Sequence, residues 1–157
     1  LVNIRAMVLL TRHFIPELRQ HKGSRILNLG SISAYYALPY KSIYAASKAF
    51  VVSFSKSLAF ELEKSGIQVS VVCPNGVKSN STSSARIKTH SFWGQLVSSE
   101  TGELARYTLD QVEKGQRVII PLFANRILLF ITRLIPERLL IRMSAKEFSK
   151  ELKYQEL

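Results

Sequence analysis

A tyrosine and a lysine stand four residues apart, at Tyr44 and Lys48, in a stretch with the composition of a helix. Side chains at positions i and i+4 of a helix lie on the same face, one turn apart, so the ammonium can act on the phenol. A free phenol has a pKa near ~10 and is a poor acid or base at neutral pH. A nearby cation favours the phenolate and lowers that pKa toward the pH at which an acid/base catalyst works best. Ser31, thirteen residues before Tyr44, supplies a hydroxyl that could share a carbonyl oxygen with the phenol.

Two strands and one helix must hold these groups. The strand predicted over residues 25–32 includes Ser31 and is apolar on both faces, as expected for a central parallel strand. The helix predicted from Tyr44 to about residue 64 would end at Gly66. Its inward residues are Val51, Phe54, Leu58 and Leu62. A second strand over residues 68–73 completes a β-α-β unit whose crossover helix carries Tyr44 and Lys48.

The order of these features resembles the short-chain dehydrogenase/reductase family. Along the chain come Val2-Asn3 on a helix over residues 1–20, then Ser31, Tyr44-x-x-x-Lys48 and a Pro-x-Gly-like turn at Pro74-Asn75-Gly76. The resemblance implies an α/β fold, a Rossmann-like doubly wound parallel sheet. Family members begin with a Gly-rich loop that binds the cofactor pyrophosphate, and none of the seven glycines here forms that motif. The resemblance therefore implies the C-terminal half of a longer protein, and a self-sufficient domain of 157 residues is the alternative.

The resemblance also implies an activity and roles for four residues. The family transfers a hydride between a nicotinamide and a carbonyl or alcohol carbon, with proton transfer at oxygen. Tyr44 would be the proton donor or acceptor, and Lys48 would lower its pKa and bind the nicotinamide ribose. Ser31 would orient and polarise the substrate oxygen, with Ser33 as the rival for that role. Asn3 would hold a water that relays protons toward Lys48, whereas an asparagine near a helix start is often just a cap. Without this context, Tyr44 and Lys48 would be interpreted as an incidental surface pair.

The nicotinamide end of the cofactor is expected along residues 74–79. The expected contacts are Pro74, Asn75, Gly76, Val77 and Ser79, together with Asn3, Tyr44 and Lys48. Asn75 stands where the family usually has glycine, and asparagine tolerates a left-handed backbone better than most residues. Ser79 can replace the usual threonine hydroxyl. The cofactor is expected to be NADP or NAD, with NADP slightly favoured, although the residues that distinguish them belong to the family's N-terminal half.

The rest of the chain divides into a loop, a short α/β segment and a tail. Residues 78–100 resemble the family's flexible loop that closes over substrate. A helix reaching residue 114 and a strand over residues 117–120 follow, and the domain, residues 1–124, is expected to end there. Residues 125–157 form a basic helical tail, too interrupted by charge and proline to span a membrane. Within it, residues 137–153 predict an amphipathic helix that packs on the domain, lies on an anionic membrane or forms a partner interface.

Charge and composition limit the classes of partner that are expected. The net charge is +11, with 12 Lys or Arg against 3 acids in residues 1–90 and 7 against 4 in residues 125–157. No arginine-rich run, zinc pattern or aromatic–basic interleaving is present in the sequence, so nucleic acid is not an expected partner. The three histidines have neither cysteine nor carboxylate at ligand spacing, so no metal site is expected. The single cysteine favours a reducing, cytoplasmic setting, with peripheral membrane contact through residues 126–157 as a further expectation.

The expected substrate is a small-molecule carbonyl or alcohol. Four aromatic residues favour an apolar one: Tyr35, Tyr36, Phe92 and Trp93. Family members commonly pair the helices corresponding to residues 1–20 and 44–64, which implies a homodimer or homotetramer. The alternatives to an NAD(P)-dependent oxidoreductase are a noncatalytic relative that serves as a binding module and a membrane-surface interaction protein.

Overall fold

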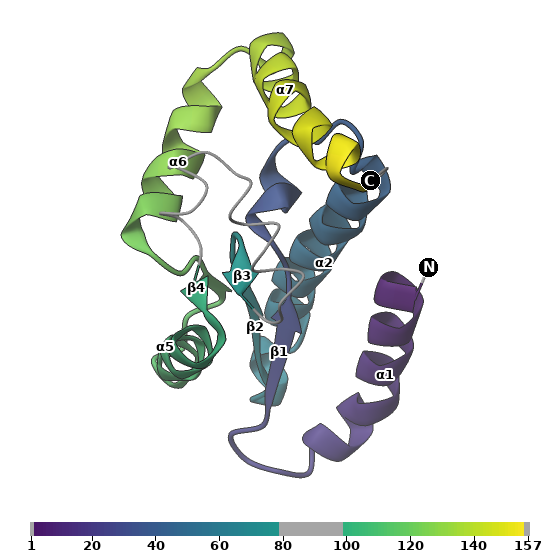
Figure 1. Ribbon diagram of the computed structural model, residues 1–157. Coiled ribbons are helices and arrows are strands. Elements are labelled where there is room, and N and C mark those ends of the chain that lie inside the picture. The colour runs from purple at the N-terminus through teal and green to yellow at the C-terminus, as the bar shows by residue number, and fades with distance from the viewer. Residues whose placement is uncertain (1, 79–98, 156–157) are drawn as a thin grey trace.

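The protein is built on a three-stranded parallel sheet, seen in a computed structural model that describes residues 2–78 and 99–155 (Figure 1). The strands β1 (Arg25–Leu29), β2 (Gln68–Val72) and β5 (Val118–Ile119) lie in the order β1-β2-β5. Arg25 pairs with Gln68 at one end of the β1-β2 ladder, and Leu29 pairs with Val72 at the other. Helix α2 (Ser42–Glu61) connects β1 to β2, so the predicted β-α-β unit is confirmed.

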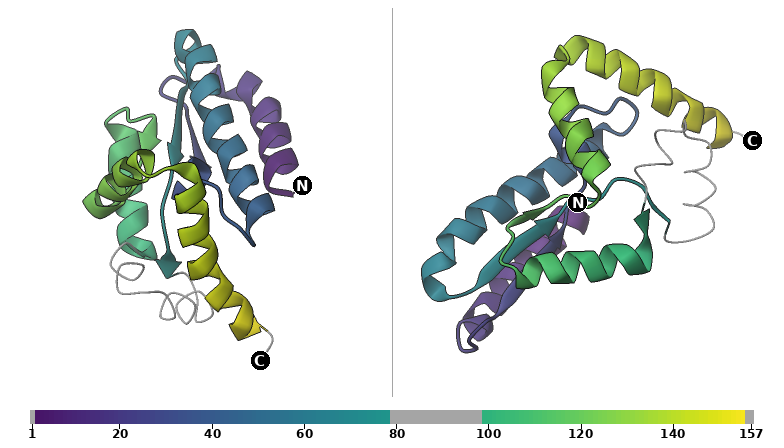
Figure 2. Two further views of the ribbon diagram at one scale, coloured as in Figure 1. Left: turned by 90° about the horizontal axis from the view of Figure 1, so that it is seen from above. Right: turned by 90° about the vertical axis from the view of Figure 1, so that its left-hand side faces the viewer.

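Helices pack against both faces of this sheet. Helix α1 (Val2–Leu18) and helix α2 lie on one face, and helix α5 (Thr101–Glu113) lies on the opposite face (Figure 2). The α2 face is filled by two apolar clusters, one with Val51 and Val71 and one with Leu58 and Val69. The α5 face is filled by a third cluster. This layering is the doubly wound α/β arrangement that the resemblance implied.

Strand β1 differs from the expectation in two respects. The side chains of Leu27 and Leu29 are 36% and 67% exposed, so β1 is not covered on both faces as a central strand would be. The strand ends at Leu29 rather than at residue 32, and the short 3₁₀ helix η1 (Ile32–Tyr35) follows. The physical reason is that the Ser31 side chain accepts a hydrogen bond from the backbone N–H of Ser33 and so starts a turn.

Helix α2 ends close to its predicted position. The 3₁₀ turn η2 (Glu63–Ser65) follows it, and Gly66 closes the segment with a left-handed φ of 71°. A glycine adopts this conformation at little steric cost, which explains why the chain turns there into β2.

The C-terminal part consists of two helices rather than one. Helix α6 (Phe123–Leu134) was not predicted, whereas α7 (Glu137–Gln155) matches the predicted amphipathic helix.

Earlier in the chain, the two-residue strands β3 (Val77–Lys78) and β4 (Ser99–Glu100) pair in parallel. Most of the expected substrate loop, with Ser79, Phe92 and Trp93, lies outside the described residues, and the domain boundary at residue 124 stays a prediction.

Candidate active site

The end of β1 and the first turns of α2 meet at Lys48. Its Nζ donates a hydrogen bond of 2.7 Å to the carbonyl oxygen of Leu29, the last residue of β1. The carboxyl ends of parallel strands are where α/β folds build their ligand sites. Lys48 therefore lies at the edge of the sheet where the resemblance expects the chemistry.

Tyr44 and Lys48 lie on the same side of α2, as the spacing predicts. The Lys48 ammonium lies 5.8 Å from the centroid of the Tyr44 ring, and the Tyr44 residue is 44% exposed. Burial lowers the pKa of Lys48, and only a negatively charged Cys73 thiolate would oppose this shift. Burial also raises the pKa of Tyr36 to about 12, and the charge of Tyr44 contributes in the same direction. The two phenols are thus close enough to interact electrostatically.

Ser31 ties the end of β1 to the predicted cofactor turn. It is 6% exposed, and its hydroxyl lies 3.4 Å from the carbonyl oxygen of Pro74, to which it donates a long hydrogen bond. The backbone N–H of Ile32 donates to the same oxygen at 3.0 Å. Two segments that are 43 residues apart in the sequence are therefore joined at the site.

Gly30 lets these two segments approach each other. Its N–H donates to the carbonyl oxygen of Val72 at 2.8 Å. A Cβ at this position would lie 3.0 Å from both the Cys73 sulfur and a Val71 methyl carbon. This tight fit of Gly30 against β2 depends on tertiary packing, which residue spacing does not show.

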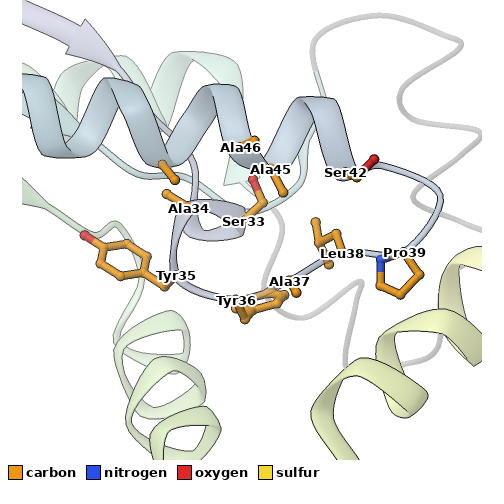
Figure 3. Close-up of a pocket in the computed structure, with 11 residues that line it drawn as sticks. Ser33, Ala34, Tyr35, Tyr36, Ala37, Leu38, Pro39, Ser42, Ala45 and Ala46 are labelled. Atoms are coloured by element: carbon orange, nitrogen blue, oxygen red, sulfur yellow. The ribbon is translucent and has the colours of Figure 1, made fainter. Parts of the chain in front are cut away.

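Ser33 is the second hydroxyl at the site, and its surroundings differ from those of Ser31. It is 6% exposed, and within the described part of the chain its Oγ is the buried side-chain oxygen that has no hydrogen-bond partner. It lines a cavity of about 590 Å³ between the η1 loop and α2, and the hydroxyl points toward α2 (Figure 3). Other lining residues are Tyr36, Leu38, Ala45, Ala46 and Ala49. The cavity wall is therefore largely apolar, and the Ser33 hydroxyl adds a group that is able to accept or donate a hydrogen bond.

The turn after β2 is held by a buried amide. Asn75 Nδ2 donates to Asn125 Oδ1 at 3.2 Å, and Asn125 Nδ2 donates to the carbonyl oxygen of Pro121 at 2.9 Å. Among the described residues, the non-glycine positions with positive φ are Tyr40 and Leu122, so Asn75 does not adopt the left-handed backbone that was expected of it. Asparagine serves this turn instead through its side-chain amide, which anchors it to α6.

Gly76 and Val77 continue the turn into β3. The Gly76 carbonyl oxygen accepts a hydrogen bond from the backbone N–H of Ser99 at 2.9 Å, so the two ends of the expected substrate loop are joined. Val77 starts β3, and Ser79 lies outside the described residues. Asn3 lies in the first turn of α1, and its side chain belongs to the part of the chain that is not described.

Cys73 is buried beneath the site. The residue is 0% exposed, and its sulfur lies 3.9 Å from the Tyr35 hydroxyl. Burial raises the pKa of the Cys73 thiol and also that of the Tyr35 phenol. A buried thiol with a raised pKa stays protonated near neutral pH and is unreactive. In the ranges that the structure covers, no three His, Cys, Asp or Glu side chains are grouped as metal ligands would be.

Comparison with known proteins identifies the family. The sequence model of the short chain dehydrogenases matches residues 1–90, which is more than half of the chain. The chain therefore belongs to the short chain dehydrogenase family, and the family resemblance is confirmed.

Similar proteins include reductases and dehydrogenases. Dehydrogenase/reductase SDR family member 7B of Rattus norvegicus is 29% identical over 97% of this chain and 48% of its own length. Estradiol 17-beta-dehydrogenase 2 of Mus musculus is 33% identical over 80% of this chain and 32% of its own length. The 3-oxoacyl-[acyl-carrier-protein] reductase of Rickettsia felis is 36% identical over 52% of this chain and 34% of its own length. The chain thus spans half or less of the length of these relatives.

Solved structures confirm the fold class. A short chain dehydrogenase from Burkholderia cenocepacia, solved in complex with NADP, superposes with a TM-score of 0.70 at 22% identity, over 88% of this chain and 56% of that one. A short-chain dehydrogenase from Sphingobium yanoikuyae in complex with NADPH gives a TM-score of 0.58 at 26% identity, over 85% of this chain and 52% of that one.

Proposed function

We propose that the protein is an NAD(P)-dependent oxidoreductase that transfers a hydride between the nicotinamide and a carbonyl or alcohol carbon. The observation that carries this proposal is the hydrogen bond from Lys48 to Leu29, which holds a partly buried ammonium beside the end of β1 and on the Tyr44 side of α2. Relatives named as dehydrogenases and reductases support the reaction class.

The residues of this chain fit a nicotinamide cofactor. An ammonium has three N–H donors, and Leu29 accepts one, so Lys48 retains donors for ribose hydroxyls. The turn from Pro74 to Val77 is the segment proposed to meet the nicotinamide amide, with Ser79 and Asn3 as further proposed contacts. The bound cofactor would supply or accept the hydride. Structures of similar proteins in complex with NADH, NADPH and NADP support this cofactor class.

The proton is proposed to move at the Tyr44 hydroxyl. In the reducing direction, the phenol donates its proton to the substrate oxygen, and the Lys48 charge stabilises the phenolate that remains. Ser31 donates a hydrogen bond to the same oxygen by exchanging its long contact with Pro74 for a shorter one to substrate. Asn3 is proposed to hold the water that returns a proton toward Lys48.

We further propose that the substrate is apolar. The cavity beside Ser33 supports this idea, because tyrosine, leucine, proline and alanine side chains form most of its wall. Ser33 would then offer its hydroxyl, which has no partner among the described residues, to a polar atom of the substrate, while Ser31 serves the reacting oxygen.

Oligomerisation and location are proposals of the same kind. Exposed apolar side chains on α1 and α2 support a homodimer or homotetramer through these helices, namely Leu9, Leu10, Phe14 and Phe60. We also propose that the protein acts in the cytoplasm, with or without contact to the membrane surface. Sedimentation of the full-length protein measures its molar mass directly, and a monomer at micromolar concentration would refute the assembly.

The decisive experiment compares the full-length protein with its Tyr44→Phe variant. We expect saturable fluorescence changes with NADPH or NADH in both proteins, and carbonyl reduction that falls by at least about a hundredfold in the variant. A noncatalytic binding module would bind the cofactor without turnover in either protein. Failure of both nucleotides to bind the parent would refute the oxidoreductase proposal.

A further inference from the structure

Helix α6 carries its large apolar side chains outward. Five of them are exposed: Phe123 by 74%, Ile127 by 45%, Phe130 by 64%, Ile131 by 46% and Leu134 by 70%. Their spacing places them on one face of the helix. We call this face the α6 ridge. The opposite side buries Leu129 and the polar Asn125, so most of the large apolar side chains of α6 face solvent.

The orientation of α6 is fixed rather than loose. Asn125 is 0% exposed, accepts a hydrogen bond from Asn75 and donates one to Pro121. Leu129 packs in the same cluster as Val51 and Val71. Rolling the helix to hide its ridge would break these hydrogen bonds and leave buried amide groups unsatisfied, which is costly.

Positive charge borders the ridge. Arg126 and Arg133 are exposed and lie on one flank of it, and α6 contains no acidic residue. The Arg126 guanidinium also donates to the Ile120 carbonyl oxygen and the Tyr107 hydroxyl, which holds it at this flank. Helix α7 adds the exposed side chains of Arg138, Arg142 and Lys146.

We propose that the α6 ridge docks on an anionic lipid bilayer, with the helix lying in the plane of the headgroups. An apolar face with a cationic border is the pattern that such interfacial helices use. In the described ranges, no helix has both the length and the apolar character that crossing a bilayer requires. A second copy would fit the ridge poorly, because α6 offers arginines and no acid to pair with them.

The expected interfacial helix, residues 137–153, fits this role less well. Ile141, Ala145 and Phe148, which form its apolar face, are each half-buried. The Lys41 ammonium lies 4.2 Å from the centroid of the Phe148 ring, so this face of α7 is partly covered by the domain. We therefore assign the main lipid contact to α6, and α7 contributes charge together with the exposed side chains of Leu139 and Met143.

The test is co-sedimentation of the full-length protein with phosphatidylcholine vesicles, with and without about 30% phosphatidylserine. We expect binding to the anionic vesicles only, and at least a tenfold weaker partition for the Phe123→Ser/Phe130→Ser variant. The matched control is Leu109→Ser on α5, because Leu109 is 58% exposed, close to the 64% of Phe130. The control should bind within twofold of the parent, and circular dichroism should show all three proteins folded with similar melting temperatures.

Three results would overturn the proposal. The first is that the parent fails to bind anionic vesicles at about 0.1 M salt, and the second is that Leu109→Ser loses as much binding as the α6 variant. The third is that the α6 variant has a lower molar mass in sedimentation than the parent but binds vesicles equally well, which would show that another protein surface covers the ridge.

The cationic border is tested separately. Arg133→Gln should weaken binding to anionic vesicles severalfold and should leave the melting temperature unchanged.

Discussion

The ammonium of Lys48 and the carbonyl oxygen of Leu29 are joined by a hydrogen bond of 2.7 Å. Leu29 is the last residue of β1, and Lys48 lies in the second turn of α2, so this bond fixes the helix against the end of the strand. A lysine side chain has many rotamers, and holding one of them costs entropy that the charge-assisted bond offsets. The position of the charge near Tyr44 is therefore set before any ligand binds.

Replacing Lys48 with methionine should affect both stability and catalysis. We expect the free energy of unfolding to fall by about 1 kcal/mol, because the Leu29 carbonyl loses a charged donor at a partly exposed site. Turnover should fall much more, because the cation beside Tyr44 is gone. Urea denaturation and kcat/KM, measured on the same preparations, check the two effects. Unchanged turnover would contradict the role proposed for Lys48.

The Ser31→Ala and Ser33→Ala variants should differ in stability. Ser31→Ala removes an acceptor for the Ser33 N–H and a donor to Pro74, so the free energy of unfolding should fall by about 1 kcal/mol. Ser33→Ala should leave it unchanged within about 0.5 kcal/mol, because that hydroxyl is buried without a partner among the described residues. Thermal and urea unfolding measure the difference. On our proposal Ser31→Ala also lowers kcat more than Ser33→Ala does. A larger loss of kcat in Ser33→Ala would instead assign the contact with the reacting oxygen to Ser33.

A methyl group at Gly30 should be poorly tolerated. The added Cβ would lie 3.0 Å from the Cys73 sulfur and 3.1 Å from the Val72 carbonyl oxygen, so the two strand ends would have to separate. We expect Gly30→Ala to lower the free energy of unfolding by about 1–3 kcal/mol. Gly102→Ala is the matched control, because a Cβ there meets nothing within 4 Å. Equal melting temperatures for the two variants would contradict the close approach.

Tyr36 should make the protein sensitive to alkaline pH. Its pKa is raised from 10.0 to about 12, chiefly by burial, so the folded protein retains a proton that the unfolded chain loses. The contribution of the protonated Tyr36 phenol to the free energy of unfolding is fully present below about pH 10. It is lost as the pH rises toward 12, so the free energy of unfolding falls by up to about 3 kcal/mol. The parent should therefore lose more stability than Tyr36→Phe between these pH values. Urea denaturation at each pH measures the difference, and parallel curves would refute the assignment.

The sequence predicted the local parts of the site and missed the distant ones. Tyr44 and Lys48 share a face of α2 because spacing along a single helix is a local property. The approach of Ser31 to Pro74 follows from two parallel strands ending at the same edge. The fold class and the family are confirmed, whereas the roles of Asn3, Ser31, Tyr44 and Lys48 stay predictions.

Other features depend on packing that spacing cannot encode. The hydrogen bond between Asn75 and Asn125 joins residues 50 positions apart. Helix α6 was not predicted for two reasons. Its N-cap residue, Leu122, offers no side-chain cap, and Leu128 and Leu129 lie opposite the ridge, so apolar residues on both sides of the helix obscure its periodicity. Its orientation is set by the burial of Asn125, a polar residue that a pattern-based prediction would place outside.

The amide of Asn125 connects α6 to the turn after β2 through two hydrogen bonds. It anchors α6 on one side and holds Asn75, in the turn proposed to meet the cofactor, on the other. A ligand that favours one geometry of this turn also favours the matching position of α6, and the coupling is reciprocal. If the proposed nucleotide and lipid sites lie at these two places, each ligand would change the affinity for the other by the same factor, through a single buried side chain.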